Sequence, residues 1–175
     1  MKNHSFSFSI KKFIIFFLIL IIGQAVSPHI RIFGVAPNFI FITTLAATLC
    51  EKEPGILIYS LIFGLFYDFI NGLTFGVFTL LFFLISFVFG KMYHTYFEDM
   101  TTIQTLLFVF ASAVYSIVMA MVTANASPDT GFLYLFVRIS LIELVYNSVI
   151  GIIVINIYKR IVAKKTMSYR GYYGY

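Results

Sequence analysis

The sequence has few charged side chains. Asp, Glu, Lys and Arg make up 11% of its 175 residues, whereas 61% are hydrophobic and the mean hydropathy is +0.97. A soluble domain of this size carries about a quarter charged residues, because its surface must face water. Too few polar side chains remain here to cover such a surface. The composition excludes an ordinary soluble domain and predicts an integral membrane protein.

Residues that commonly carry chemistry are also scarce. With the single cysteine Cys50, no intramolecular disulfide and no cysteine-based metal cluster can form. His4, His29 and His94 are scattered over both predicted membrane sides, so we expect no metal site and no cofactor. The sequence contains no H-E-x-x-H, G-x-S-x-G or P-loop motif. These absences predict that the protein is not an enzyme. For an enzyme that acts on lipid, the sequence offers one local pair of polar residues, Asp68 and Asn71. This pair is weak evidence, because Asn71 is explained more simply as a loop residue.

What is present is hydrophobic sequence in six stretches. A helix needs about 20 residues to cross the hydrocarbon core of a bilayer. The first, fifth and sixth stretches satisfy this length, whereas the three between them are shorter and contain polar, glycine or proline residues. Such helices are tolerated at membrane depth where they pack against protein or line a cavity. We therefore predict an all-α, polytopic integral membrane protein of about six transmembrane helices, at residues 10–27, 35–50, 55–71, 73–90, 103–124 and 133–158.

The basic residues predict the orientation. If both termini are cytoplasmic, ten of the twelve Lys and Arg residues lie inside, in the two tails and at Lys52 and Lys91. Arg31 then lies in an outer loop and Arg138 within the sixth span. These residues flank hydrophobic segments and form no basic stripe with interleaved aromatics, so the net charge of +5 does not predict nucleic-acid binding. We expect a single helical domain over residues 1–160 and a basic, Tyr-rich cytoplasmic tail over 161–175.

The first stretch has an alternative interpretation. Lys11-Lys12, an apolar run and then Ala25-Val26-Ser27 resemble a secretory signal with a cleavage site. Pro28 directly after the cleaved bond would be unfavourable, because it lacks an N–H and has a constrained ring. We therefore favour a retained membrane anchor. Cleavage would leave the orientation of the remaining five spans unchanged.

Small residues and one acid recur every four positions in the middle of the chain. The stripe consists of Ser60, Gly64, Asp68, Gly72 and Gly76. On a helix this spacing puts small residues on one side, where another backbone can approach closely in lipid. An ionisable residue in the membrane is costly, so Asp68 should face protein or water. The pattern predicts a helix-packing or partner-docking face.

Arg138 lies at a depth that matches Asp68. Counting helical rise from the span ends puts Asp68 about 10 Å and Arg138 about 9 Å below the outer face. Intramembrane charges usually pair, since an unpaired one costs at least about 2.5 kcal/mol. We predict that Asp68 and Arg138 form an ion pair between the third and sixth helices. In the alternative, Arg138 extends to the outer headgroups by itself.

A second stripe with four-residue spacing lies on the sixth helix. It consists of Glu143, Asn147 and Gly151, with Glu143 about 16 Å deep and close to the midplane. Glu143 is expected to be protonated, hydrogen-bonded to Asn147, or placed in a polar cavity. A proton or substrate site is one interpretation. Polar contact between helices, or a face offered to a partner's helix, is the one we favour.

The first stripe carries a family resemblance. The segment from Gly64 to Gly76, GLFYDFINGLTFG, resembles the G-L-x-x-D-x-x-x-G-x-x-x-G core of the bacterial rod shape-determining protein MreD family. Pro37-Asn38 looks like that family's proline-containing segment, and Asn147 is similar to its late polar position. The resemblance implies a non-catalytic membrane subunit of the elongasome in the bacterial cytoplasmic membrane. It also implies partners in peptidoglycan synthesis: an MreC-like periplasmic scaffold, MreB, RodA and a class B penicillin-binding protein.

A transporter subunit is the alternative. Short helices, a broken-helix region and a deep acid also look like the substrate-binding membrane subunit of an energy-coupling-factor vitamin transporter. That interpretation predicts an outward-opening solute pocket near Asp68, lined by Asn71 and by aromatic side chains such as Tyr67.

Overall fold

The chain folds into a bundle of α-helices that follow the predicted hydrophobic stretches. The computed structural model describes residues 10–52, 55–72, 75–97, 100–126 and 132–170. Six α-helices lie within these residues, and the predicted all-α fold is confirmed. The one β-type contact in this part of the chain is an isolated antiparallel bridge between Ile32 and Val35. The elements are α1 (Ile10–Val26), the 3₁₀-helix η1 (Ser27–Ile30), α2 (Phe39–Cys50), α3 (Gly55–Asn71), α4 (Val77–Tyr96), α5 (Thr101–Ala126) and α6 (Phe132–Arg170).

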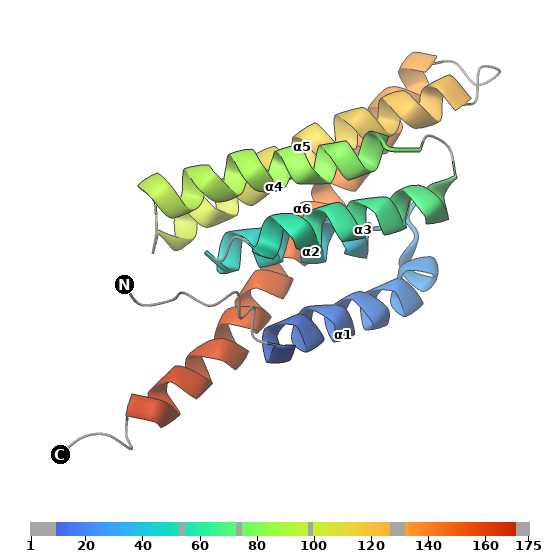
Figure 1. Ribbon diagram of the computed structural model, residues 1–175. Helices are drawn as coiled ribbons and strands as arrows, with labels where there is room; N and C mark the ends of the chain where they lie inside the picture. Colours follow the sequence, from blue (N-terminus) through green and yellow to red (C-terminus); the bar gives the residue numbers. More distant parts are fainter. Residues whose placement is uncertain (1–9, 53–54, 73–74, 98–99, 127–131, 171–175) are drawn as a thin grey trace.

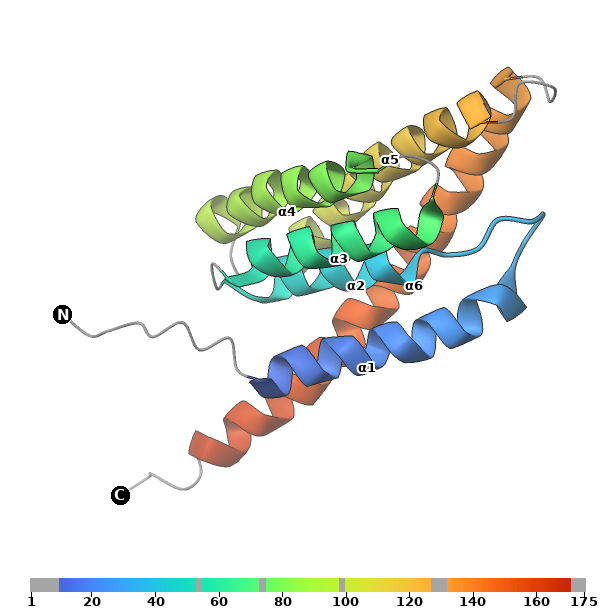
Figure 2. The same ribbon diagram turned by 45° about the vertical axis from the view of Figure 1, so that its right-hand side comes forward.

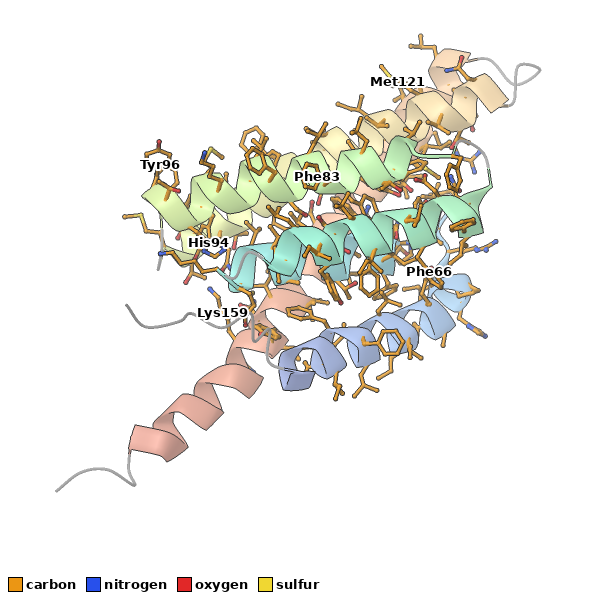
Figure 3. All side chains as sticks on the ribbon, in the orientation of Figure 1. Phe66, Phe83, His94, Tyr96, Met121 and Lys159 are labelled. Carbon is orange, nitrogen blue, oxygen red and sulfur yellow. The ribbon has the colours of Figure 1, made fainter. Side chains whose placement is uncertain are left out.

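Successive helices run in alternating directions between two ends of the bundle (Figures 1 and 2). We call the end that holds the start of α1 and the end of α6 the basic end, because Lys52, Lys91 and Lys159 lie there. The opposite end, which holds residues 27–38 and the start of α6, is called the cavity end. His94 and Lys159 mark the basic end in Figure 3, and Met121 lies toward the cavity end.

Three helices are long and apolar enough to cross a membrane, at Val77–Tyr96, Thr101–Asn125 and Phe136–Arg160. The helices α1, α2 and α3 are shorter, at 17, 12 and 17 residues. The prediction that the second and third spans are short is therefore confirmed. The prediction that the fourth is short is wrong, because α4 has 20 residues and is long enough to cross a membrane. The first is also shorter than its predicted length, because α1 ends at Val26 and a 3₁₀ turn begins at Ser27.

The shortest helix lies at the centre of the bundle. Every residue of α2 from Phe39 to Leu49 is buried, and α2 contacts all five other helices. A helix that is apolar on every side is stable only when protein surrounds it. The other helices form the outer wall, in which α5 packs on α6 and α3 packs on α4 most extensively. Because α2 has neighbours on all sides, any polar group it carries must be satisfied by protein atoms, either of its own backbone, as for Thr44, or of a neighbouring helix, as for Thr48 with Ser86.

Helix α6 continues beyond the boundary expected at residue 160. It remains helical to Arg170, so the predicted tail begins as an extension of the last helix. The hydrophobic stretch ended at 158 because basic residues follow, and basic residues continue a helix readily outside a membrane. Residues 171–175 lie outside the described part of the chain.

Candidate functional site: the polar interior

Asp68 caps the start of the neighbouring helix. Its carboxylate is buried and accepts hydrogen bonds from the backbone N–H groups of Gly76 (3.0 Å), Phe78 (3.1 Å) and Thr79 (2.9 Å). The Thr79 hydroxyl donates a further one at 2.5 Å. The first N–H groups of a helix lack partners within the helix, and its N-terminus attracts negative charge. The intramembrane acid is therefore satisfied by the N-terminus of α4.

The predicted Asp68–Arg138 ion pair is wrong. Both oxygens of Asp68 are bonded to the start of α4, whereas Arg138 donates to the backbone carbonyl oxygen of Phe33 and lies 5.8 Å from the ring centre of Tyr134. Matching depth could not reveal these partners, because most of them are backbone groups. The alternative, in which Arg138 extends to the outer headgroups, stays a prediction, and the carbonyl of Phe33 in the 31–38 loop is its hydrogen-bond partner.

The first glycine stripe is not one continuous helical face. α3 ends at Asn71, and Gly72 and Gly76 adopt positive φ angles of 64° and 90° in the turn that leads to α4. Glycine adopts this conformation with little strain. These two glycines therefore shape the turn that brings the start of α4 onto Asp68. The four-residue spacing therefore continues past the end of α3 without reflecting a helical face.

The helical part of the stripe faces α4 of the same chain. Ser60 is fully buried, and its hydroxyl donates to the carbonyl of Leu57 in its own helix. A Cβ atom on Gly64 would lie 2.6 Å from the Cα of Thr79, closer than two carbon atoms can approach. Gly64 thus allows a close approach of α3 and α4. The small residues pack helices together as predicted, but within the molecule.

A chain of polar side chains connects four helices through the core. The Asn147 amide oxygen on α6 accepts from the backbone N–H of Asn38 (3.1 Å) at the start of α2. The Asn38 amide donates to the Tyr115 hydroxyl on α5 at 2.6 Å, and that hydroxyl donates to the Tyr67 hydroxyl on α3 at 3.2 Å. Asn38 also caps α2 by accepting from the N–H of Phe41 (3.1 Å). These contacts position α3, α5 and α6 around the start of α2.

Sequence reasoning missed Tyr115, which was one aromatic residue among many. It named Tyr67 as a pocket-lining residue but did not predict its hydrogen bond to Tyr115. Asn38 had a local signal, because Asn directly before an apolar run is a preferred N-cap. Gln104 on α5 was also missed, and its amide donates to the Leu49 carbonyl at 2.6 Å. A polar residue inside a long apolar helix was the signal available for it.

The second stripe lies inside the molecule. Gly151 faces α5, where an added Cβ would overlap the ring of Phe108. Asn147 is fully buried and bonds to Asn38, so the expected bond between Glu143 and Asn147 is not formed. Glu143 is 4% exposed, and its Oε2 atom has no hydrogen-bond partner among the described residues. The expectation that Glu143 lies in a polar cavity is met.

That cavity has a volume of about 390 Å³ and lies at the cavity end. Its walls come from η1, the 31–38 loop, the ends of α1, α3 and α5, and the first half of α6. Polar side chains from these elements line it, namely Gln24, Arg31, Asn71, Thr123 and Glu143, together with Tyr67. Pockets that hold small ligands typically measure about 300–1,000 Å³. The cavity is therefore large enough for a small molecule.

The loop over the cavity is fixed to α6 at two points. Arg138 binds the carbonyl of Phe33, and the Tyr146 hydroxyl donates to the carbonyl of Ile30 at 2.7 Å. Phe33 and Gly34 form the tip with φ angles of 50° and 83°, as in a two-residue hairpin turn. Glu143 lies between Arg138 and Tyr146 on α6. The two anchors therefore hold the loop beside the carboxyl group.

A second, smaller pocket of about 220 Å³ lies at the basic end. Its lining includes Glu51, Lys52, Lys91 and His94, and the His94 Nε2 atom lies 2.8 Å from the carbonyl oxygen of Thr48. Glu51 accepts a hydrogen bond from the Tyr158 hydroxyl. In the described ranges, no three His, Cys, Asp or Glu side chains gather as metal ligands would.

These features define an all-helical membrane protein whose buried polar groups fasten short helices together and line one cavity. Residues 4–161 match the family described as rod shape-determining protein MreD, and the chain belongs to that family. The resemblance seen in the Gly64–Gly76 segment is confirmed, and so is a role in rod-shape determination. No curated protein and no solved structure matches the chain.

Proposed function

We propose that this chain is a non-catalytic, multi-pass subunit of the cell-elongation machinery in the bacterial cytoplasmic membrane, with both termini in the cytoplasm. It would join proteins of peptidoglycan synthesis: an MreC-like periplasmic scaffold, MreB, RodA and a class B penicillin-binding protein. Family membership supports the rod-shape role. The docking role is supported by one observation: a rigid helix hairpin presents a continuous row of large apolar side chains.

That row is the outer face of α3, formed by Ile58, Ile62, Phe66 and Phe69, all of them exposed. The opposite face of α3 carries Gly64 and Asp68, which hold α3 tightly against α4. In lipid, helices associate by close packing rather than by a hydrophobic driving force. Because α3 is already held against α4, its exposed side chains lose little further conformational entropy when a partner binds. Partner docking is thus assigned to the side of α3 opposite the small residues, and not to the small residues as the sequence predicted.

Photocrosslinking tests this face. We would incorporate p-benzoylphenylalanine at Phe66 on α3 and, as a matched control, at Phe110 on α5, which are 52% and 64% exposed. In membranes of a rod-shaped bacterium, Phe66 should crosslink to an MreC-like or RodA-like polypeptide, and Phe110 should not. Equal polypeptide adducts at both positions, or none at either, would contradict docking at α3.

A cellular experiment tests the role itself. Depletion of the protein should produce round cells, and the wild-type chain should restore rods. A double substitution, Ile62→Ala with Phe66→Ala, should leave protein abundance unchanged but restore rods poorly. The matched control, Leu106→Ala with Phe110→Ala on α5, should restore them fully. Full restoration by the α3 variant at normal abundance would argue against this face.

The cavity supports a second candidate, a substrate-binding subunit of a vitamin transporter. The pocket predicted for that function was to be lined by Asn71 and Tyr67, and the observed cavity has both. Loss of the protein would then cause a vitamin requirement rather than rounding. Mass spectrometry of the purified protein would also reveal a tightly bound vitamin.

A further inference from the structure

The carboxyl group of Glu143 is buried without a partner among the described residues, and this indicates a bound ligand or water. It is 4% exposed and lines the cavity, and no cation of the described residues bonds to it. A buried carboxyl group without a hydrogen-bond partner is costly in an apolar environment. The nearest intramembrane cation along the helix, Arg138, is engaged with the Phe33 carbonyl. Water or a bound donor must therefore meet Glu143.

Other cavity groups also have unused hydrogen-bonding capacity. The amide nitrogen of Asn71 and the hydroxyl of Thr123 are buried without a partner in the described structure. Asn71 offers donors, Thr123 offers a donor and an acceptor, and the carboxylate of Glu143 offers acceptors. Tyr67 also lines the cavity, and an aromatic side chain can attract a cation. This set suits a compact ligand with a cationic donor and adjoining oxygen atoms.

Arg31 adds the opposite charge to the same cavity. Arg31 is exposed, belongs to the 31–38 loop and lines the cavity wall. An arginine is well suited to bind the oxygens of a phosphate or carboxylate. The cavity thus combines a buried acid with an exposed base. A zwitterion would satisfy both, with its ammonium group toward Glu143 and its anionic group toward Arg31.

We propose that the cavity binds a small zwitterion in which a primary ammonium group meets Glu143 and a phosphate group meets Arg31. The chemistry is that of phosphoethanolamine, which a free solute or the headgroup of a phospholipid would supply. A primary ammonium can donate hydrogen bonds to Glu143, whereas a quaternary ammonium such as choline cannot. This site is separate from the proposed docking face, because Tyr67 and Asn71 line the cavity, whereas the docking face of α3 consists of Ile58, Ile62, Phe66 and Phe69.

Ligand-induced stabilisation tests the proposal. The full chain is reconstituted in nanodiscs of phosphatidylcholine with phosphatidylglycerol, and thermal unfolding is followed by circular dichroism. O-phosphoethanolamine should raise the unfolding midpoint in a saturable way if the ligand is a free solute. Replacing part of the phosphatidylcholine by phosphatidylethanolamine should raise it if the ligand is a lipid. Phosphocholine should do neither, and stabilisation by neither ethanolamine compound would overturn the proposal.

Variants assign the effect to the cavity. Glu143→Gln should weaken binding by at least about tenfold, because it removes the charged acceptor. Arg31→Gln should weaken it by about two- to fivefold, as expected for an exposed charge. The control Glu51→Gln makes the same charge change at the basic end and should bind like the wild type. Unchanged binding by Glu143→Gln, or an equal loss in Glu51→Gln, would contradict the site. Cell rounding is a separate readout, so failure of docking and failure of binding can be distinguished.

Discussion

At the scale of single residues, Asp68 shows how a membrane protein can bury an acid without a basic partner. The carboxylate takes the place of the N-terminal cap that Gly76 cannot provide, since glycine has no side chain. Three backbone N–H groups and one hydroxyl meet it. Its contribution is structural, because it joins the end of one helix to the beginning of the next.

Removing this cap should destabilise the protein strongly. Asp68→Ala leaves three backbone N–H groups of α4 without acceptors, at a cost of about 3 kcal/mol or more. Asp68→Asn keeps one oxygen and should be intermediate. The measurement is the unfolding midpoint in detergent, together with the folded amount in membranes.

Arg138 provides the control for this prediction. Arg138→Gln should cost about 1 kcal/mol, because it removes one hydrogen bond to a carbonyl. The exchanged double variant, Asp68→Arg with Arg138→Asp, should be no more stable than Asp68→Arg. Recovery of stability in the exchange would instead show that the two residues interact.

The close packing at Gly64 allows a second prediction at the scale of single residues. In Gly64→Ala the new Cβ would overlap the backbone of Thr79, so α3 and α4 must separate, which should cost about 1–3 kcal/mol. The change is read as a lower unfolding midpoint. Ser60→Ala, one turn earlier on the same face, should change it little, because the Ser60 hydroxyl bonds only within its own helix. Equal loss in both variants would show that the close approach is not critical.

Residue types were easier to predict from the sequence than residue partners. The importance of Asp68 and Glu143 followed from the cost of burying an acid in a membrane. The partner of Asp68 did not, because hydrogen bonds to backbone atoms leave no mark in side-chain spacing. The same limit applies to Arg138, whose acceptor is a carbonyl oxygen. Side-chain patterns identify which groups need a partner, and the fold decides which group supplies it.

At the scale of elements, the start of α2 depends on Asn38. Asn38→Ala removes the helix cap and the bond to Tyr115, and should cost about 2 kcal/mol. A double-mutant cycle with Tyr115→Phe measures the shared part, and a coupling energy of about 0.5 kcal/mol or more is expected for residues in contact. Additive losses would show that the two side chains act independently.

Helix positions were predictable from hydrophobic length, but helix ends were not. Each of the six apolar stretches contains one helix. α4 nevertheless extends to Tyr96, past the predicted end at residue 90, and α6 extends past 158. Hydrophobicity reports the part of a helix that lies in lipid, whereas the helix itself continues while its residues favour that conformation. The break after Asn71 was predicted, but α4 begins at Val77 rather than at residue 73, because Gly76 is still in the turn and adopts a positive φ angle.

At the scale of the whole molecule, the alternating helices put the start of α1 and the end of α6 at one end (Figure 1). Together with the basic residues, this arrangement predicts that the 31–38 loop faces outward. In a Cys50→Ala background, Phe33→Cys should react with a membrane-impermeant thiol reagent added to spheroplasts. Lys91→Cys should react only after the membrane is opened. Both positions are exposed, so accessibility within the protein does not limit the reaction. The reverse pattern would invert the proposed orientation.

The buried position of α2 has a consequence for how the protein is made. At 12 residues, α2 is too short to cross the hydrocarbon core alone, and its bonding partners lie on α5 and α6, which are synthesised later. During synthesis this segment therefore cannot settle as an independent span. The packing environment of α2 is complete only after α5 and α6 have been synthesised and inserted. A chain truncated before α5 should therefore expose α2 to quality-control proteases.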